Sequence, residues 1–402
     1  MLVGIDWSGS GHAVCVETDA GDIVVEFMIN HSRPGFNKLR RHLYRHGVPG
    51  DYVVAIERPD GRLVDYLLET GCGVVCVSPK AIHRFRFGER PSGAKCDAAD
   101  ARLICEYLRI RRNHLMVLEP FSPELVALRV LVRCRDELVK ARVRVTNQLG
   151  ANLEMFWPGP HKLFSSLDTK IAVRFLERWP EPAALTEADI AALCRECGYH
   201  KRSPAELLGR LRDAVPPKAG GPETTARGQV VTTQLNVLKT LRHEIAAIDD
   251  QIHTAFWAHP HAPVFASLPR AGTINAAQIL AEWGDTPGRY HTADSVAAYA
   301  GVVPVTKQSG RRHSVHFRHA CNKRLRRALT IFAANSRHSS NWADNAYHGA
   351  IDRGLPHSTA TRTLARRWVK VIFACTETNT PYDLDRHHSA TRQSTPAALS
   401  AQ

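Results

Sequence analysis

The sequence predicts a mixed α/β domain at the N-terminus, two long helices that flank a helical insertion, and a mainly helical C-terminal domain. Short apolar runs alternate with helical patterns in the first quarter of the chain, and two later stretches repeat apolar residues at steps of three and four. The expected parts are residues 1–115 for the α/β domain, 121–157 and 225–260 for the long helices, 158–224 for the insertion, 261–385 for the C-terminal domain and 386–402 for a disordered tail.

The α/β domain is predicted from apolar runs at residues 2–5, 13–17 and 23–29, which are separated by glycine-containing turns. Runs of this kind form a three-stranded meander. The patterns that follow predict a helix over 35–46, a strand over 52–56, a helix over 62–70, a strand over 73–77 and a helix over 97–108. Together they indicate a mixed sheet covered by helices.

A long helix is expected to begin at Ser122, because Ser122 can cap it, Pro123 suits the first helical position and Glu124 places an acid in the first turn. Its apolar residues are Leu125, Leu128, Val132, Val139, Leu149, Leu153 and Phe156. A partner pattern consists of Val231, Leu235, Leu238, Leu241, Ile245, Ile248, Ile252 and Phe256. Two such helices form either an antiparallel stalk or a dimerising coiled coil.

The positive charge of the chain is concentrated in one region. The net charge is +14, and residues 301–375 hold fourteen Lys or Arg against two acids, Asp344 and Asp352, so they contribute +12. A solvated surface usually mixes the two signs more evenly. The concentration therefore indicates contact with a polyanion, and nucleic acid is the partner that we expect.

The remaining composition indicates a protein of the cytoplasm. No apolar run approaches the ~18 residues of a membrane helix, and the first residues resemble a buried strand rather than a signal peptide. The ten cysteines are scattered and are expected to be reduced thiols. Cys194 and Cys197, with His200 nearby, could be half of a zinc site, but no matching pair follows, so two thiols on an amphipathic helix are favoured.

Four acidic residues occur where strands end and a helix begins. Asp6 ends the first apolar run, Glu57 ends another, and Asp97 and Asp100 lie three residues apart at a helix start. Acids at the ends of buried strands are costly unless they are paired or bound to a metal. A carboxylate cluster suits two hard cations about 4 Å apart, which assist phosphoryl transfer. Taken singly, Asp6 could cap a turn, Asp97 could cap a helix and Asp100 could pair with Arg or Lys.

These acids stand in motifs that resemble a known family. The segments Gly4-Ile-Asp6 with His12, Ala55-Ile-Glu57, Val77-Ser-Pro79 and Asp97-Ala-Ala-Asp100 resemble the RuvC-like, ribonuclease-H-fold domain of the DEDD transposases of the insertion-sequence-110 family. The resemblance implies that Asp6, Glu57, Asp97 and Asp100 form the DEDD quartet and bind magnesium. The family often has Lys near the first Asp where this chain has Ser10, a difference that affects none of the four ligands.

A serine in the basic region is the second candidate site. Ser309 is followed by Gly310, which allows close approach of a phosphate, and Lys307, Arg311 and Arg312 could stabilise the charge that develops during attack. By itself, a serine in such a segment is most simply a turn residue. The stretch from Asn322 to Arg327 is most simply a helix whose basic face follows a DNA backbone. The residues expected to contact nucleic acid are Lys307, Arg311, Arg312, Arg318, Asn322, Lys323, Arg324, Arg326 and Arg327.

The same family resemblance extends through the C-terminal region. It is carried by Leu268-Pro-x-x-Gly272, Ala300-Gly-Val-Val-Pro304, Ser309-Gly310 and Asn322-x-x-Leu-Arg326. It implies that Ser309 is the nucleophile, with Ser314 as a weaker alternative. The family commonly has glycine where this chain has Arg270 and Cys321, which leaves Ser309 in place but changes the local backbone requirements.

The resemblance also implies partners and a reaction. The chain is expected to be a transposase or recombinase that cuts and rejoins DNA through a transient serine link, assisted by Mg²⁺. Element ends and target DNA, an element-encoded guide RNA, and further copies of the chain in a homodimer or larger assembly are the expected partners. The protein would associate with the nucleoid when active.

Two other functions fit part of the sequence. Asp6-Trp-Ser-Gly9 permits an actin-like ATPase or sugar kinase, but the second phosphate loop and the glycine-rich adenosine segment of those proteins are absent from the sequence. A non-catalytic nucleic-acid-binding protein would share the basic region but would not depend on the acids. Magnesium-dependent DNA cleavage discriminates between that protein and an enzyme.

Overall fold

The structure, a computed structural model, describes residues 1–89, 96–286, 288–310 and 312–387. It divides into two compact units, Met1–Pro120 and Phe121–Gln402. Of the predicted disordered tail, residues 388–402 lie outside the described residues. None of the helices described is both long enough and apolar enough to span a membrane.

A five-stranded mixed sheet forms the centre of the first unit. Its strands are β1 (Leu2–Trp7), β2 (Gly11–Glu17), β3 (Ile23–Asn30), β4 (Val53–Ile56) and β5 (Gly73–Cys76). The order across the sheet is β3-β2-β1-β4-β5. The first three strands are antiparallel neighbours, as the meander prediction requires, whereas β4 and β5 run parallel to β1. The predicted mixed sheet is therefore confirmed.

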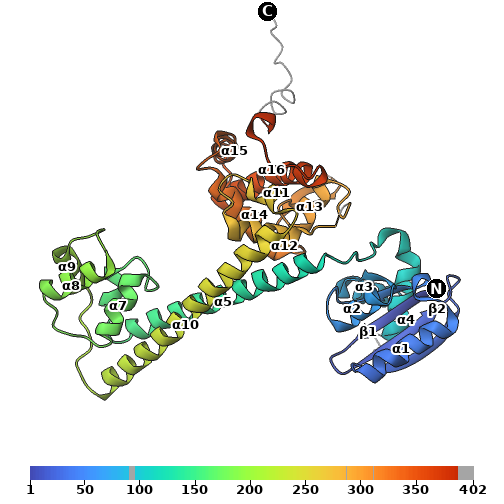
Figure 1. Cartoon of the computed structure of the whole chain (residues 1–402), viewed down its shortest axis with the longest axis horizontal. Coiled ribbons are helices and arrows are strands. Elements are labelled where there is room, and N and C mark those ends of the chain that lie inside the picture. Colours follow the sequence, from blue (N-terminus) through green and yellow to red (C-terminus); the bar gives the residue numbers. More distant parts are fainter. Residues whose placement is uncertain (90–95, 287, 311, 388–402) are drawn as a thin grey trace, which may run out of the picture. The chain divides into compact units, whose positions relative to one another are not determined.

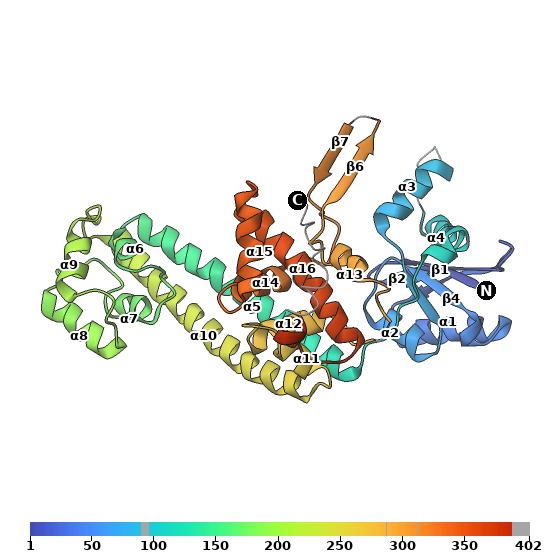
Figure 2. The ribbon, with the colours of Figure 1, turned by 90° about the horizontal axis from the view of Figure 1, so that it is seen from above.

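Helices cover both faces of this sheet, and one of them was not predicted (Figure 2). The helices of this unit are α1 (Arg33–His46), α2 (Arg62–Glu69), α3 (Pro79–Glu89) and α4 (Asp97–Arg111), with short 3-10 turns at Pro49–Asp51 and Arg112–His114. Apolar residues of α1 and α2 pack against one face, and those of α3 and α4 against the other. The sequence analysis did not anticipate α3.

Two long antiparallel helices organise the second unit (Figure 1). They are α5 (Pro123–Glu154) and α10 (Pro222–Ala258). The Ser122 hydroxyl accepts a hydrogen bond from the Leu125 backbone N–H at 3.1 Å, so the predicted cap is confirmed. Because the start of α5 and the end of α10 share one apolar core, and their other ends share a second, the two helices form an antiparallel stalk.

The insertion between the long helices is helical, as expected. It contains α6 (Gly159–Leu163), α7 (Lys170–Arg178), α8 (Glu187–Cys197) and α9 (Pro204–Arg212). These helices pack on the end of α5 and the start of α10. Both Cys194 and Cys197 lie on α8, the first buried and the second half-buried, which agrees with the prediction of two thiols on an amphipathic helix.

The C-terminal part of the second unit is mainly helical, with one two-stranded ribbon. Its helices are α11 (Ala262–Ala266), α12 (Thr273–Trp283), α13 (Ala293–Tyr299), α14 (Lys323–Ser336), α15 (Asn341–Asp352) and α16 (His357–Glu377). Their apolar residues form one core with the ends of α5 and α10. The ribbon consists of β6 (Val305–Ser309) and β7 (Arg312–His316), and it projects from these helices (Figure 2).

Candidate functional site

The first two predicted acids lie at the ends of neighbouring parallel strands. Ile5 of β1 pairs with Ile56 of β4, and Asp6 and Glu57 are the next residues of their respective chain segments. Alternation along β1 places Asp6 on the same face as Leu2, which is the face covered by α4. Both acids are partly exposed. The sheet register therefore brings these two acids to adjacent positions, as the sequence predicted.

The other two acids lie on the first turn of α4, which crosses the same face. A Cβ atom at Gly4 would lie 2.2 Å from the Ala101 carbonyl oxygen, so only glycine permits this close approach of β1 and α4. Asp97 is exposed, whereas Asp100 is 4% exposed. Packing at Gly4 thus fixes the helix that carries Asp97 and Asp100 over β1, which carries Asp6 near its end.

The buried Asp100 carboxylate pairs with an arginine. Arg86 Nη2 of α3 lies 2.5 Å from Asp100 Oδ1, and both side chains are largely buried. The ion-pair alternative considered for Asp100 is therefore present in this structure. The sequence gives no signal for Arg86, because no pattern predicts α3 and no local pattern links residue 86 to residue 100.

The donor chemistry of the quartet suits magnesium, because carboxylate oxygens are the ligands that this ion prefers. The carboxylate oxygens of the four acids are spread more widely than the ligand atoms of a closed metal site. Among the described residues, no three of these acids bring ligand oxygens within 4.8 Å of one another. In this structure the Arg86 guanidinium provides the positive charge at Asp100.

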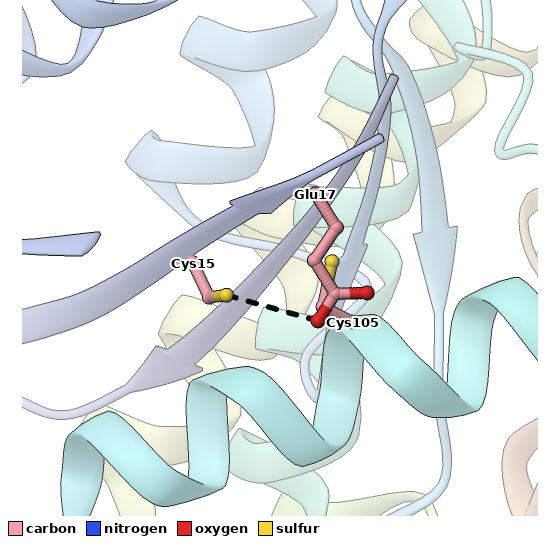
Figure 3. Close-up of side chains that lie close together, drawn as sticks. All are labelled: Cys15, Glu17 and Cys105. Atoms are coloured by element: carbon pink, nitrogen blue, oxygen red, sulfur yellow. Dashed lines mark hydrogen bonds between the residues drawn. The ribbon is translucent and has the colours of Figure 1, made fainter. Parts of the chain in front are cut away.

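A different group on the same face of the sheet does meet that distance. Ligand atoms of Cys15, Glu17 and Cys105 all lie within 4.8 Å of one another, and all three side chains are buried (Figure 3). Burial raises the pKa of Glu17, although the nearby charge of Arg109 opposes that change. A hydrogen bond with Cys15, together with burial, raises the pKa of the Cys105 thiol. Cys15 and Cys105 pack in the apolar core of this face, and Cys15 Sγ donates to Glu17 Oε1 at 3.9 Å, so we interpret this group as part of the domain core.

The predicted nucleophile lies at the tip of the ribbon. Ser309 is the last residue of β6 and pairs with Arg312, the first residue of β7. Gly310 has a φ of 55°, a left-handed conformation that favours glycine in the tight turn. The Ser309 hydroxyl is exposed and makes no hydrogen bond to another described residue. Arg311, also a predicted site residue, lies outside the described residues.

One face of the ribbon combines the two candidate serines with basic side chains. Alternation places Lys307 and Ser309 on the same face, and their partners across the ribbon are Ser314 and Arg312. The Ser314 hydroxyl lies 2.9 Å from His316 Nε2. The sequence predicts a turn here but not the two strands, because their side chains are nearly all exposed and lack an apolar pattern.

Asn322, predicted to contact nucleic acid, uses its side chain inside the protein. Its Oδ1 accepts hydrogen bonds from the Arg324 and Leu325 backbone N–H groups, both at 3.1 Å, and thereby caps α14. Its Nδ2 donates to Glu282 Oε2 at 2.9 Å and to the Tyr299 hydroxyl at 3.1 Å. The first two bonds cap α14, and the other two join its start to α12 and α13.

Glu282 is a buried acid that the sequence analysis did not identify. It is 2% exposed and accepts hydrogen bonds from Arg133 Nε at 2.9 Å and Arg129 Nη2 at 3.4 Å. Burial alone would raise the pKa of Glu282, but the hydrogen bonds from Arg133 and Asn322 and the two arginine charges lower it below its usual value. Glu282 therefore holds α5, α12 and the start of α14 together.

The predicted basic residues of α14 differ in their surroundings. Arg324 and Arg327 are exposed and pair with Asp136 of α5, the second at 2.5 Å. Lys323 is exposed. Arg326 is half-buried and donates to the Arg318 carbonyl oxygen at 2.9 Å. The exposed basic residues thus form two groups. Lys307 and Arg312 lie on the ribbon, and Lys323, Arg324 and Arg327 lie on α14.

Comparisons with known proteins agree with both parts of this arrangement. A family model described as a transposase matches residues 3–158, which include all four acids of the quartet. The model of the transposase IS116/IS110/IS902 family matches residues 262–348, which include Ser309 and α14.

Related proteins match over almost the whole chain. The proposed transposase of the IS117 mini-circle of Streptomyces coelicolor is 29% identical over 401 residues, or 96% of each chain. The uncharacterized 44.8 kDa protein of insertion element IS116 of Streptomyces clavuligerus is 30% identical over 390 residues, or 93% of this chain and 94% of that protein. The chain therefore belongs to the transposase family that includes IS116, IS110 and IS902.

Proposed function

We propose that this chain cuts and rejoins DNA as the transposase of an insertion sequence, with Ser309 as the nucleophile. Membership of a transposase family supports DNA as the substrate. The observation that carries the serine assignment is the exposed ribbon, where Ser309 shares a face with Lys307 beside Arg312. A hydroxyl at the end of a projecting, basic ribbon is sterically free to reach a phosphate of DNA.

The proposed step exchanges one phosphodiester for another. Ser309 Oγ bonds to phosphorus and loses its proton to solvent, while the bond from phosphorus to one deoxyribose oxygen breaks and that oxygen takes up a proton. Lys307 and Arg312 stabilise the negative charge on the phosphoryl oxygens. Because the phosphoserine link keeps the energy of the broken bond, attack by another DNA hydroxyl reverses the step and rejoins strands without a nucleotide.

The four acids of the first unit are proposed to hold Mg²⁺. Asp6 and Glu57 follow adjacent strands, and Asp97 and Asp100 lie on the helix that crosses the same face. When bound, the ion would stabilise charge on a phosphate and on a leaving oxygen. The strand order with α4 packed at Gly4 supports the RuvC-like, ribonuclease-H fold that the resemblance implies.

The proposed nucleic-acid surface comprises the ribbon and the basic residues of α14. Lys307, Arg311, Arg312, Arg318, Lys323, Arg324, Arg326 and Arg327 belong to it, whereas Asn322 supports it from within. The family resemblance supports a structured guide RNA as a second partner. Exposed valines on α5, namely Val126, Val130 and Val143, support association with further copies of the chain.

The serine assignment is tested with the full-length chain and a DNA fragment that carries the element ends. Ser309→Ala should abolish strand cleavage and the covalent protein–DNA adduct seen on a denaturing gel, while DNA affinity stays within about threefold. Ser339→Ala, an exposed serine of the same unit, is the matched control. Normal cleavage by the Ser309→Ala protein would refute the assignment.

The alternative function, non-catalytic nucleic-acid binding, is tested through the acids. Asp6→Ala should remove Mg²⁺-dependent cleavage and leave DNA affinity unchanged, because Asp6 lies outside the proposed nucleic-acid surface. If the parent chain binds DNA but shows no cleavage with Mg²⁺ and its guide RNA, the non-catalytic alternative is correct.

A further inference from the structure

A groove with an unusual combination of charge and apolar surface lies between α14 and α16. Its volume is about 480 Å³, and its lining includes Phe317, Lys323, Arg326, Ile331 and Arg362. Phe317 is 43% exposed and Ile331 is 39% exposed. The groove therefore presents an aromatic ring and an aliphatic side chain to solvent beside several cations.

Three of the four Lys and Arg side chains that line the groove form no ion pair with a described residue. The lining contains no acidic residue. Arg327 pairs with Asp136, but no ion pair joins Lys323, Arg326 or Arg362 to a carboxylate that the structure describes. Burial and the neighbouring charge of Arg326 lower the pKa of Arg362. An anion bound between or beside these two guanidinium groups would therefore stabilise their positive charges.

The two arginines are held in fixed positions around one aromatic ring. The Cζ atoms of Arg326 and Arg362 lie 4.5 Å and 5.0 Å from the Phe317 ring centroid. Arg326 is anchored on the Arg318 carbonyl oxygen, and Arg362 Nη2 donates to Thr359 Oγ1 at 2.9 Å. A ring and two guanidinium planes that are already ordered bind a planar group at a small entropic cost.

The N-terminus of α16 also opens into this groove. His357 and Ser358, the first two residues of this 21-residue helix, are exposed and line the groove. The preceding residue, Pro356, provides no side-chain cap, so the first backbone N–H groups stay available to an anion. This adds a positive helix end to the two unpaired arginines.

We infer that this groove binds an unpaired DNA strand, with its phosphates on Arg326, Arg362 and the start of α16 and a base against Phe317 and Ile331. Duplex DNA presents phosphates but no free base face, so the apolar surface favours an unpaired strand. The inference rests on the proposed function and specifies the form of DNA that the groove binds.

The position of Phe317 in the chain favours DNA over RNA as the occupant. Phe317 directly follows β7, and Ser309 pairs with Arg312 at the other end of that strand. At about 3.4 Å per residue, five residues of extended chain put the tip about 17 Å from Phe317. A strand held in the groove would thus lie within a few nucleotides of the proposed nucleophile.

The inference is tested by fluorescence anisotropy with labelled oligothymidine of about twelve nucleotides, a duplex of equal length and oligouridine. Phe317→Ala and Arg362→Ala should each weaken binding of the single DNA strand about tenfold and change duplex affinity by less than about threefold. Phe317→Tyr, which keeps the ring, should bind like the parent chain. Arg367→Ala removes an exposed charge elsewhere on α16 and is the control for charge alone.

Thermal melting confirms that each variant folds, and binding is measured without cleavage, so the outcome does not depend on Ser309. Unchanged affinity of folded Phe317→Ala for the single strand would overturn the inference. Equal losses on single strand and duplex would assign the groove to duplex backbone instead. Larger losses on oligouridine than on oligothymidine would assign it to RNA, and either result also overturns the inference.

Discussion

Arg86 Nη2 lies 2.5 Å from Asp100 Oδ1, in a pair that is buried beside the face of the sheet where Asp6 also lies. The pair joins α3 to α4 and supplies a positive charge to one member of the proposed metal-binding quartet. A metal ion and Arg86 would therefore stabilise the same carboxylate. This relationship leads to the first prediction.

Arg86→Gln should lower the free energy of unfolding by about 3 kcal/mol in the absence of metal, because it leaves the Asp100 charge buried and unpaired. Mg²⁺ should restore more stability to this variant than to the parent chain, as measured by the melting temperature with and without the ion. Arg62→Gln, which breaks exposed ion pairs with Asp65 and Glu69, is the control and should cost less than about 1 kcal/mol. Equal effects of Mg²⁺ on variant and parent would contradict the shared role of Arg86 and metal.

The two candidate serines are distinguished by their partners. Ser314 lies 2.9 Å from His316 Nε2, a possible base, whereas the Ser309 hydroxyl is exposed at the tip. If Ser309 is the nucleophile, Ser309→Ala should reduce adduct formation by a factor on the order of 10³ or more, and Ser314→Ala should retain it within about tenfold. The opposite ranking in a single-turnover adduct assay would transfer the role to Ser314 with His316 as its base.

The buried His12 ring should make the protein less stable in mild acid. Its Nδ1 accepts a hydrogen bond from the Ser8 backbone N–H at 3.3 Å, so the neutral ring carries its proton on Nε2, 2.9 Å from His31 Nδ1. Burial, with the charge of His31, lowers the pKa of His12 from 6.5 to about 4. The unfolded chain therefore binds more protons between these two pH values, and stability falls as pH drops from 6.5 towards 4.

The measurement is chemical unfolding of the parent chain and of His12→Asn at several pH values. The Asn variant keeps an acceptor for Ser8 but does not titrate, so the stability difference between the two proteins should shrink as the pH falls below 6.5. Above that pH the difference should be constant. A constant difference across the whole range would show that His12 does not titrate as proposed.

Arg270 has a φ of 57°, a left-handed backbone conformation that few residues other than glycine adopt. Arg270 is exposed, so substitutions there test the backbone rather than packing. Arg270→Gly should change the free energy of unfolding by less than about 1 kcal/mol, because relief of strain offsets the added freedom of the unfolded chain. Arg270→Val should lower it by more than about 1 kcal/mol, because a branched side chain disfavours this conformation. Equal stabilities would show that the turn does not require positive φ.

Asn322 and Lys323 are adjacent but should affect different properties. Asn322→Ala removes the α14 cap and a hydrogen bond to buried Glu282, and should lower the free energy of unfolding by about 2 kcal/mol. Lys323→Ala should leave stability unchanged and weaken DNA affinity, with a smaller salt dependence. Unfolding curves and anisotropy titrations on both variants check this; a stable Asn322→Ala protein with weakened DNA affinity would give Asn322 a direct binding role.

Local patterns were sufficient to predict most elements of the fold. The Ser122 cap, the strands that lead to Asp6 and Glu57, and the apolar spacing of α5 and α10 depend on residues within a few positions of one another. The sequence also singled out the residues that are proposed to carry the chemistry, namely the four acids, Ser309 and the basic stretch that follows it. Local hydrogen bonding and periodic burial explain why these features can be predicted from the sequence alone.

Only the tertiary structure decided how several of these residues are used. Arg86 meets Asp100 through packing of two helices on a sheet, and Asn322 turns inward because Glu282, forty residues away, lies beneath it. The ribbon that carries Ser309 has no buried face, so its sequence lacks the alternation of apolar and polar residues that would predict strands. Ion pairs between distant residues and exposed strands depend on three-dimensional register and packing, which short-range sequence patterns do not encode.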